Sequence, residues 1–171
     1  AREFLECIRL FEPYVSARER TGDYQDALVT EVYFRPLATA CVNLGHSLRR
    51  MNRLDTAIEL YTGAADLAPG YVPAHESLGR ALIEKGTALR DKRESADNSM
   101  KAVKPDEAEL NLYRSAVAHL YVACQLESRN PGVRVALSNG LRNWGVLDGA
   151  LTHAKTAAGI APSDAESQYT L

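Results

Sequence analysis

Histidine and cysteine are the residues of this chain whose chemistry could support catalysis or metal binding. The 171 residues include four histidines and three cysteines: His46, His75, His119, His153, Cys7, Cys41 and Cys124. An imidazole beside a thiol could activate a nucleophile, and several such groups together could hold zinc. Cys41 lies five residues from His46, and His119 lies five residues from Cys124. Because five residues of a helix turn through about 500°, neither pair shares a helix face.

Other patterns that mark catalytic sites do not occur in the sequence. It contains no H-E-x-x-H, C-x-x-C, G-x-S-x-G or phosphate-binding P-loop. The segment GRALIEKGT at 79–87 has two glycines and a lysine, but Lys85 precedes Gly86 and no strand pattern leads into it. We therefore predict that the protein is not an enzyme, with no catalytic residue, no metal site and no cofactor.

The composition is that of an ordinary soluble protein, with 46% hydrophobic and 25% charged residues. A net charge of −2 gives no reason to expect nucleic-acid binding. No apolar run approaches the roughly 20 residues that span a bilayer, and no signal-peptide pattern is visible, so we expect no direct membrane insertion. The odd number of widely spaced cysteines predicts buried thiols and a cytoplasmic or other reducing intracellular location.

The elements that would position these residues are predicted to be helices. Nearly every apolar segment follows helical spacing, and no segment alternates as a strand does. Alanine and leucine are abundant, and the breaks fall at glycine and proline. The sequence therefore predicts an all-α fold.

A set of small, aromatic and helix-ending residues follows fixed intervals in the stretch from 41 to 69: Leu44, Gly45, Ala57, Tyr61, Ala64 and Pro69. Small residues let two helices approach closely, the tyrosine fills space between adjacent hairpins, and the proline ends the second helix. The pattern resembles the tetratricopeptide repeat (TPR), with Cys41 in the place of the family's first-helix tryptophan. This resemblance implies stacked antiparallel helix hairpins, an α-solenoid wound into a right-handed superhelix.

The resemblance divides residues 1–171 into a single TPR-like array that begins and ends within repeats, so we expect a fragment of a longer array or one with capping helices. Its parts are a degenerate partial repeat (1–36), a repeat (38–71), a repeat with an insertion at about 87–107 (72–130), a repeat (131–164) and the start of a further or capping helix (165–171).

The insertion is rich in charge and has no periodic apolar face, so we interpret it as a surface loop, with a docking element as the alternative. Gly86, just before it, falls where the family often has its turn glycine. Pro105, Asp106 and Glu107 predict a helix from about 106 to 128, because proline suits the first turn and acidic groups suit the positive end of the helix dipole.

In the TPR family the first helix of each hairpin lines a concave groove that binds a peptide or a partner's segment. Asn43 matches an asparagine that often holds the ligand backbone, since an amide can donate and accept at once. The arginines either make the groove basic or are solvated surface groups. The family's clamp for chaperone C-termini is not matched, because Pro73 and Ser77 occupy two of its places. Carried over by position, the candidate partner-binding residues are Asn43, His46, Arg49, Arg50, Ser77, Arg80, Asn139 and Arg142.

The resemblance implies a scaffold or adaptor domain that binds a protein or peptide, and we expect it to be part of a larger protein or multiprotein complex. The stretch LGHSLRRMNRLDTAIELY is similar to the TPR subunits of the anaphase-promoting complex, within one repeat. A second likeness is to plant-type mitochondrial outer-membrane import receptors, which also carry an insertion before a Pro-Asp-Glu helix start. The alternatives are therefore a TPR-type organelle import receptor, a regulatory domain of a larger enzyme, and a structural homo-oligomer.

Overall fold

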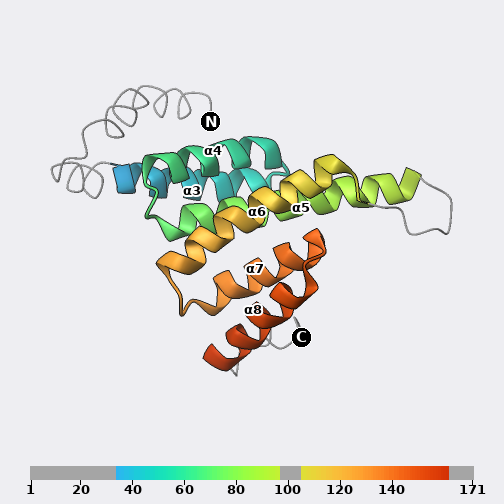
Figure 1. Ribbon diagram of the computed structural model, residues 1–171. Coiled ribbons are helices and arrows are strands. Elements are labelled where there is room, and N and C mark those ends of the chain that lie inside the picture. Colours follow the sequence, from blue (N-terminus) through green and yellow to red (C-terminus); the bar gives the residue numbers. More distant parts are fainter. Residues whose placement is uncertain (1–33, 97–104, 162–171) are drawn as a thin grey trace, which may run out of the picture. The chain divides into compact units, whose positions relative to one another are not determined.

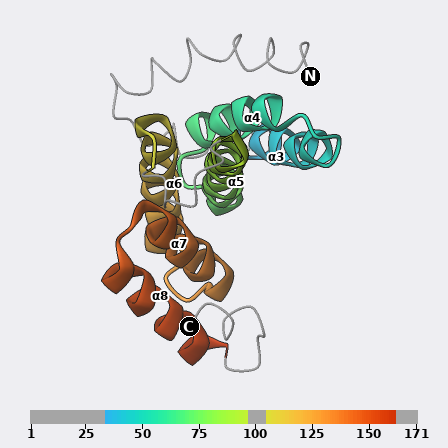
Figure 2. The same cartoon turned by 90° about the vertical axis from the view of Figure 1, so that its right-hand side faces the viewer.

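The computed structural model describes residues 34–96 and 105–161 (Figures 1 and 2). Within these two ranges the chain forms helices and no strand, which confirms the all-α prediction. The predicted partial repeat before residue 34 and the predicted helix start at 165–171 lie outside the described residues. The helices are α3 (Arg35–Arg50), α4 (Leu54–Leu67), α5 (Val72–Ala96), α6 (Glu107–Leu126), α7 (Pro131–Trp144) and α8 (Leu147–Ile160).

The chain falls into two compact units whose boundary lies inside α5, between Ser77 and Leu78. The described part of the first unit contains α3, α4 and the start of α5. The second unit contains the rest of α5 together with α6, α7 and α8. The assignment of all the repeats to a single array stays a prediction.

In the first unit, α3 packs against α4, and a short turn joins them. A Cβ atom at Gly45 would lie only 2.4 Å from Cε1 of Tyr61, so the absence of a side chain allows the tyrosine ring to press against α3. Tyr61 and Leu60 are completely buried. The close approach at glycine, expected from the repeat pattern, is thus present. The contact shown for Tyr61 lies within its own hairpin, and its expected role between adjacent hairpins stays a prediction.

Both ends of α4 follow from local sequence. The turn before it contains Asn52 in the left-handed region (φ 59°), a conformation that asparagine tolerates better than most residues. The helix stops at Leu67; the next residue, Ala68, has φ −135° and ψ 81°, outside the helical region, which a following proline disfavours. Nε2 of His75 lies 2.9 Å from the carbonyl oxygen of Pro69, and the His75 side chain is buried. His75 therefore ties the start of α5 to this turn.

The second unit contains two hairpins, α5–α6 and α7–α8, and α6 packs on α7. Gly79 of α5 faces the side chain of Leu120, at the position that corresponds to the Gly45–Tyr61 contact. Asn130 caps α7, since its side-chain oxygen accepts a hydrogen bond from the amide of Val133 at 3.2 Å. Gly145 ends α7 with φ of 91°, a left-handed conformation that suits glycine.

The insertion is helical over its first half, so the surface-loop interpretation is wrong for residues 87–96. Helix α5 continues without a break to Ala96, and α6 begins at Glu107, close to the predicted start. Gly86 is not a turn residue either, because it lies inside α5. A Cβ atom at Gly86 would lie 2.7 Å from Cε1 of Tyr113, so this glycine admits a buried ring from α6.

Heptad spacing explains why α5 and α6 continue side by side (Figures 1 and 2). Gly79, Gly86 and Arg93 are seven residues apart and therefore lie on one face of α5. Gly79 contacts Leu120, and Gly86 contacts Tyr113. Nε of Arg93 lies 3.0 Å from Oε1 of Glu109, whose side chain is only 2% exposed. The hairpin is thus held by two glycine contacts and then by a buried ion pair.

The helix bounds show which elements contain the inserted residues. Helix α8 begins and ends 93 residues after α4, whereas α6 ends 59 residues after α4. The repeat pattern places equivalent residues 34 apart, as in Gly45 and Gly79, so the second hairpin is longer by 25 residues. Relative to the first hairpin, α5 ends 12 residues later and α6 begins 6 residues earlier. Most of the insertion therefore lengthens the two helices.

Candidate functional site

The C-terminal half of α3 carries four of the eight sequence-predicted site residues. Asn43, His46 and Arg50 follow i, i+3, i+7 spacing, so they lie on one face of the helix. Asn43 and Arg50 are exposed, and His46 is half-buried. Arg49 is also exposed but lies on the other side of His46. Helix α3 thus presents an amide, an imidazole and two guanidinium groups within about two turns.

His46 is held in place by residues from two other helices. The hydroxyl of Tyr61 lies 2.9 Å from Nδ1 of His46, and Nε2 lies 3.5 Å from Oγ of Ser77. Hydroxyl groups can donate or accept, so the imidazole tautomer decides which group donates in each of these two contacts. The rings of His46 and Tyr61 are tilted by 57° with centroids 5.5 Å apart. The structure therefore brings together two of the candidate residues, His46 and Ser77.

Burial lowers the pKa of His46, and the positive charges of Arg49 and Arg50 lower it further, while Glu76 acts in the opposite direction. The pKa of the folded state is thus below 6.5, the ordinary value. This shift favours the uncharged imidazole at neutral pH, in which one ring nitrogen donates a hydrogen bond and the other accepts one. Tyr61 was predicted only as a core residue, and its hydroxyl is the part of this cluster that the sequence pattern did not indicate.

Arg80 has a different setting from the exposed arginines. Its NH2 group donates to the carbonyl oxygen of Gly132 at 3.0 Å, and its side chain is partly buried. Gly132 lies in the first turn of α7, so this bond links two consecutive first helices. Arg80 therefore has a structural role, whatever part it plays toward a partner.

The last two predicted residues lie on α7. Asn139 is half-buried and Arg142 is exposed, and their i, i+3 spacing puts them on one face. They belong to the second unit, whereas Asn43, His46, Arg49, Arg50 and Ser77 belong to the first. The prediction that both sets line one groove therefore stays a prediction.

Charge is distributed unevenly between the helices of a hairpin. Helix α3 contains three arginines and no acidic residue, and α7 contains two arginines and no acidic residue. Helix α4 has the opposite composition, with Asp55, Glu59 and Asp66 and no basic residue. In the first hairpin the first helix is therefore basic and the second is acidic, even though the chain as a whole is mildly acidic.

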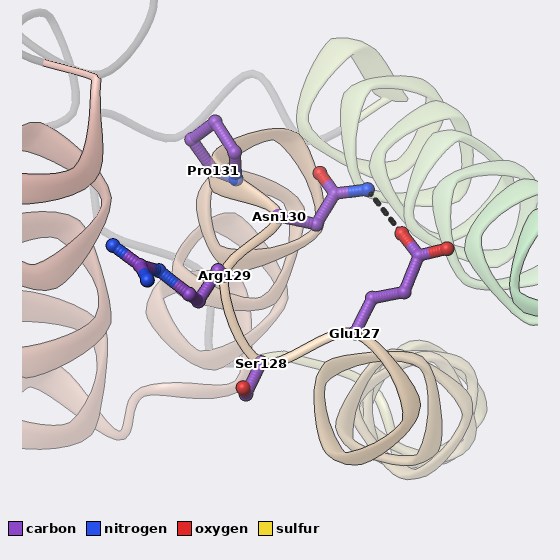
Figure 3. A pocket seen from close by; sticks show the side chains of 5 residues that line it. All are labelled: Glu127, Ser128, Arg129, Asn130 and Pro131. Carbon is purple, nitrogen blue, oxygen red and sulfur yellow. Dashed lines mark hydrogen bonds between the residues drawn. The ribbon is translucent and has the colours of Figure 1, made fainter.

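A shallow, open hollow of about 540 Å³ lies on the surface at the turn between α6 and α7 (Figure 3). In Figure 3 the side chains of Asn130 and Glu127 point toward one another, and Nδ2 of Asn130 donates to Oε2 of Glu127 at 2.9 Å. Nε of Arg134 donates to the carbonyl oxygen of Ser128 at 2.8 Å. These polar groups bond to each other, so we interpret the hollow as a braced turn. Its lining residues are Glu127, Ser128, Arg129, Asn130 and Pro131.

Groups suited to catalysis or metal binding are dispersed in the described ranges, 34–96 and 105–161. No three His, Cys, Asp or Glu side chains within them are arranged to hold a metal ion. Cys41 and Cys124 are buried and do not form a disulfide. Burial raises the pKa of the Cys41 thiol to about 11, which keeps it protonated at neutral pH. None of the helices in these ranges combines the length and the hydrophobicity that a transmembrane segment needs.

Comparisons with known proteins find a similar solved structure but no similar sequence. No family model and no curated protein matches the chain. The structure is similar to the TPR domain of Arabidopsis OM64, with a TM-score of 0.62 and 10% sequence identity. The match covers 80% of this chain and 93% of that domain. At this identity the similarity concerns the fold, and the protein folds as a helical repeat of the TPR type.

Proposed function

We propose that the protein is a protein–protein interaction module that binds a peptide or a partner's segment through the polar faces of its first helices. One observation carries this proposal: the cluster on α3 formed by the exposed Asn43 and Arg50 and the half-buried His46. This cluster lies on a helix whose Gly45 is packed tightly against Tyr61. A rigid helix thus presents the side chains of Asn43 and Arg50, beside an imidazole that Tyr61 and Ser77 hold in place.

The chemistry of this cluster suits a peptide backbone with an acidic group nearby. The Asn43 amide can donate to a carbonyl oxygen and accept from a backbone N–H at once. Arg50 can form two parallel hydrogen bonds with a carboxylate. His46 is already held by Tyr61 and Ser77, so little of its conformational freedom would be lost when a ligand binds.

Such a module would work within a larger protein or a multiprotein complex, and its buried reduced thiols suit the cytoplasm or another reducing intracellular compartment. The similarity to the Arabidopsis OM64 TPR domain is compatible with the import-receptor alternative, and a regulatory domain of a larger enzyme would use the same fold. The polar character of the α3 cluster favours the general interaction module over a receptor for amphipathic, largely apolar segments.

The test is capture of partners from the native source with a mass-spectrometric readout, comparing the wild type with the variant Asn43→Ala/Arg50→Glu. Arg80 is left unchanged, because its bond to Gly132 would confound folding with binding. The matched control is Arg129→Glu, an identical charge reversal at an exposed residue of the α6–α7 turn.

We expect stoichiometric partners that the α3 variant loses and the control keeps, with both variants folded by circular dichroism. Partners that survive in both variants would place the binding surface elsewhere and refute the role of the α3 cluster. Equal loss in both variants would also contradict it, because the effect would then follow net charge alone.

A further inference from the structure

Most polar side chains of α3 are already engaged inside the protein. Those with a hydrogen bond, a ring contact or another polar interaction are Arg35, Thr39, His46, Ser47 and Arg49. The side-chain amide of Asn43 and the guanidinium of Arg50 have no hydrogen-bond or ion-pair partner among the described residues. Both side chains are exposed, and their seven-residue separation puts them on one face of the helix. Helix α3 therefore offers a partner two unengaged groups on a single face.

This pair of residues belongs to the first hairpin and is not a property of the repeat. The first helices of the other two hairpins have different residues at the equivalent positions, 34 and 93 residues later: Ser77 and Glu84 in α5, and Ala136 and Asn143 in α7. Neither helix combines an amide with a cation at these positions. The stacking of hairpins therefore does not require Asn43 and Arg50.

The face of α3 between these two groups is formed by side chains that are small or held in place. His46 is half-buried and is held by Tyr61 and Ser77. Oγ of Ser47 donates to the carbonyl oxygen of Asn43 at 3.2 Å, so this short side chain stays close to its own helix. The main chain of a partner can therefore pass along this face and reach both groups.

The spacing of the two groups sets the register of such a partner. Seven residues of an α-helix rise by about 10.5 Å, and an extended chain rises by about 3.3 Å per residue. Three residues of an extended segment therefore match the separation of Asn43 and Arg50 along the helix. The long arginine side chain extends this range by about one residue in either direction.

The charge around Arg50 favours an acidic residue at that place. Helix α3 contains no acidic residue, and its last turn contains both Arg49 and Arg50. Glu76 of α5 acts electrostatically on His46, but it forms no ion pair with Arg50. A guanidinium can bind a carboxylate through two parallel hydrogen bonds, whereas a lysine or arginine of the partner would be repelled.

We propose that the ligand of this face is an extended internal segment of a partner protein. Its main chain bonds to the amide of Asn43, and an aspartate or glutamate about three residues away pairs with Arg50. This inference rests on the proposed function and adds the conformation, the charge and the register of the bound segment. Because the carboxylate comes from a side chain, a free C-terminus is not required.

The first test is selection of short peptides by the full chain from a random library in which both peptide ends are joined to the carrier. We expect the selected peptides to share one acidic position and to bind Arg50→Glu at least about tenfold more weakly than the wild type. Selection by Arg50→Glu should return lysine or arginine at that position. The control Arg129→Glu should select the same peptides as the wild type, and circular dichroism checks that each variant is folded.

The register is measured by replacing each backbone amide of a selected peptide in turn by an ester, which removes one N–H donor. One ester should weaken binding to the wild type and leave binding to Asn43→Ala unchanged. This ester should lie about two to four residues from the acidic position. The synthetic peptide should bind equally well with an amidated and with a free C-terminus.

The outcomes separate this inference from the proposed function on which it rests. Peptides that depend on Asn43 and Arg50 but share no acidic position would overturn the inference and leave the proposed function standing. So would an Asn43-dependent ester outside the expected range, or binding that requires a free C-terminus. A selection that returns no peptide, or only peptides that bind Asn43→Ala and Arg50→Glu as tightly as the wild type, would overturn both.

Discussion

The contact between Gly45 and Tyr61 gives the sharpest test of the fold. Carbon atoms in contact rest about 3.5–4.0 Å apart. In Gly45→Ala the new Cβ atom would lie 2.4 Å from Cε1 of Tyr61 and 2.9 Å from both Cδ1 and Cζ. The ring has little room to move, because it is fully buried and its hydroxyl is 2.9 Å from Nδ1 of His46. The substitution must therefore separate α3 from α4 or break that hydrogen bond.

The expected size of the effect follows from two opposing contributions. Overpacking a well-packed core costs about 1–3 kcal/mol, and overlap with three ring atoms puts this site near the upper end of that range. Alanine is more stable than glycine inside a helix by about 1 kcal/mol. We therefore expect Gly45→Ala to lower the free energy of unfolding by about 2 kcal/mol and Tm by about 4–8 °C.

Gly159→Ala is the matched control, because it makes the same chemical change in the last turn of another helix. Gly159 is an exposed residue of α8, and a Cβ atom there would meet nothing within 4 Å. This variant should gain about 0.5–1 kcal/mol of stability. Urea and thermal unfolding followed by circular dichroism measure both variants. If Gly45→Ala proved as stable as Gly159→Ala, the packing described for the first hairpin would be wrong.

Three further predictions concern buried polar groups. Arg93→Ala should lower the free energy of unfolding by about 3 kcal/mol, because it leaves the Glu109 carboxylate buried without its cation. In urea titrations, the stability lost by Arg93→Ala/Glu109→Ala should be smaller than the sum of the losses in the two single variants. The folded state lowers the pKa of His46, so as pH falls below about 6.5 the imidazole is protonated in the unfolded chain before it is protonated in the folded protein. The free energy of unfolding should therefore decline with pH until the folded-state pKa is passed. NMR titration of His46 and urea midpoints from pH 7.5 to 5 measure this decline, which should be weaker in His46→Gln. The Cys41 thiol, with a pKa of about 11, should resist iodoacetamide at pH 8 in the folded protein and react in urea, as read by peptide mass spectrometry; rapid labelling without urea would contradict its burial.

The fold class and the first hairpin could be predicted because their signals are local. Gly45 and Tyr61 lie within one repeat, and their spacing reflects a single contact between neighbouring helices. Pro69 and Asn130 act on the turns beside them, so their effects on helix bounds can be seen in the sequence. Such short-range patterns survive even where overall identity to a similar structure is 10%.

The candidate site was predictable only as a set of positions. The repeat pattern predicted both Arg80 and Arg50 as partner-binding residues. In the structure, Arg80 donates to a backbone carbonyl 52 residues away. Likewise, the pattern assigned Tyr61 to the core, and only the structure shows its hydroxyl beside His46. These partners depend on how distant helices meet, and no spacing along the chain encodes that information.

The insertion shows how a charged segment can be misinterpreted and why the stack tolerates it. Residues 87–107 have few apolar side chains, so a search for an apolar face indicates a loop, but an antiparallel pair of helices can also be held by glycine and by ions. The seven-residue interval from Gly79 through Gly86 to Arg93 keeps one face of α5 toward α6, because seven residues return to nearly the same angle. Since the added residues lie beyond the Gly79–Leu120 contact, they lengthen the hairpin without shifting its register. The contact of Gly140 with Val117 and Ile83, through which α7 packs on this hairpin, is thereby preserved.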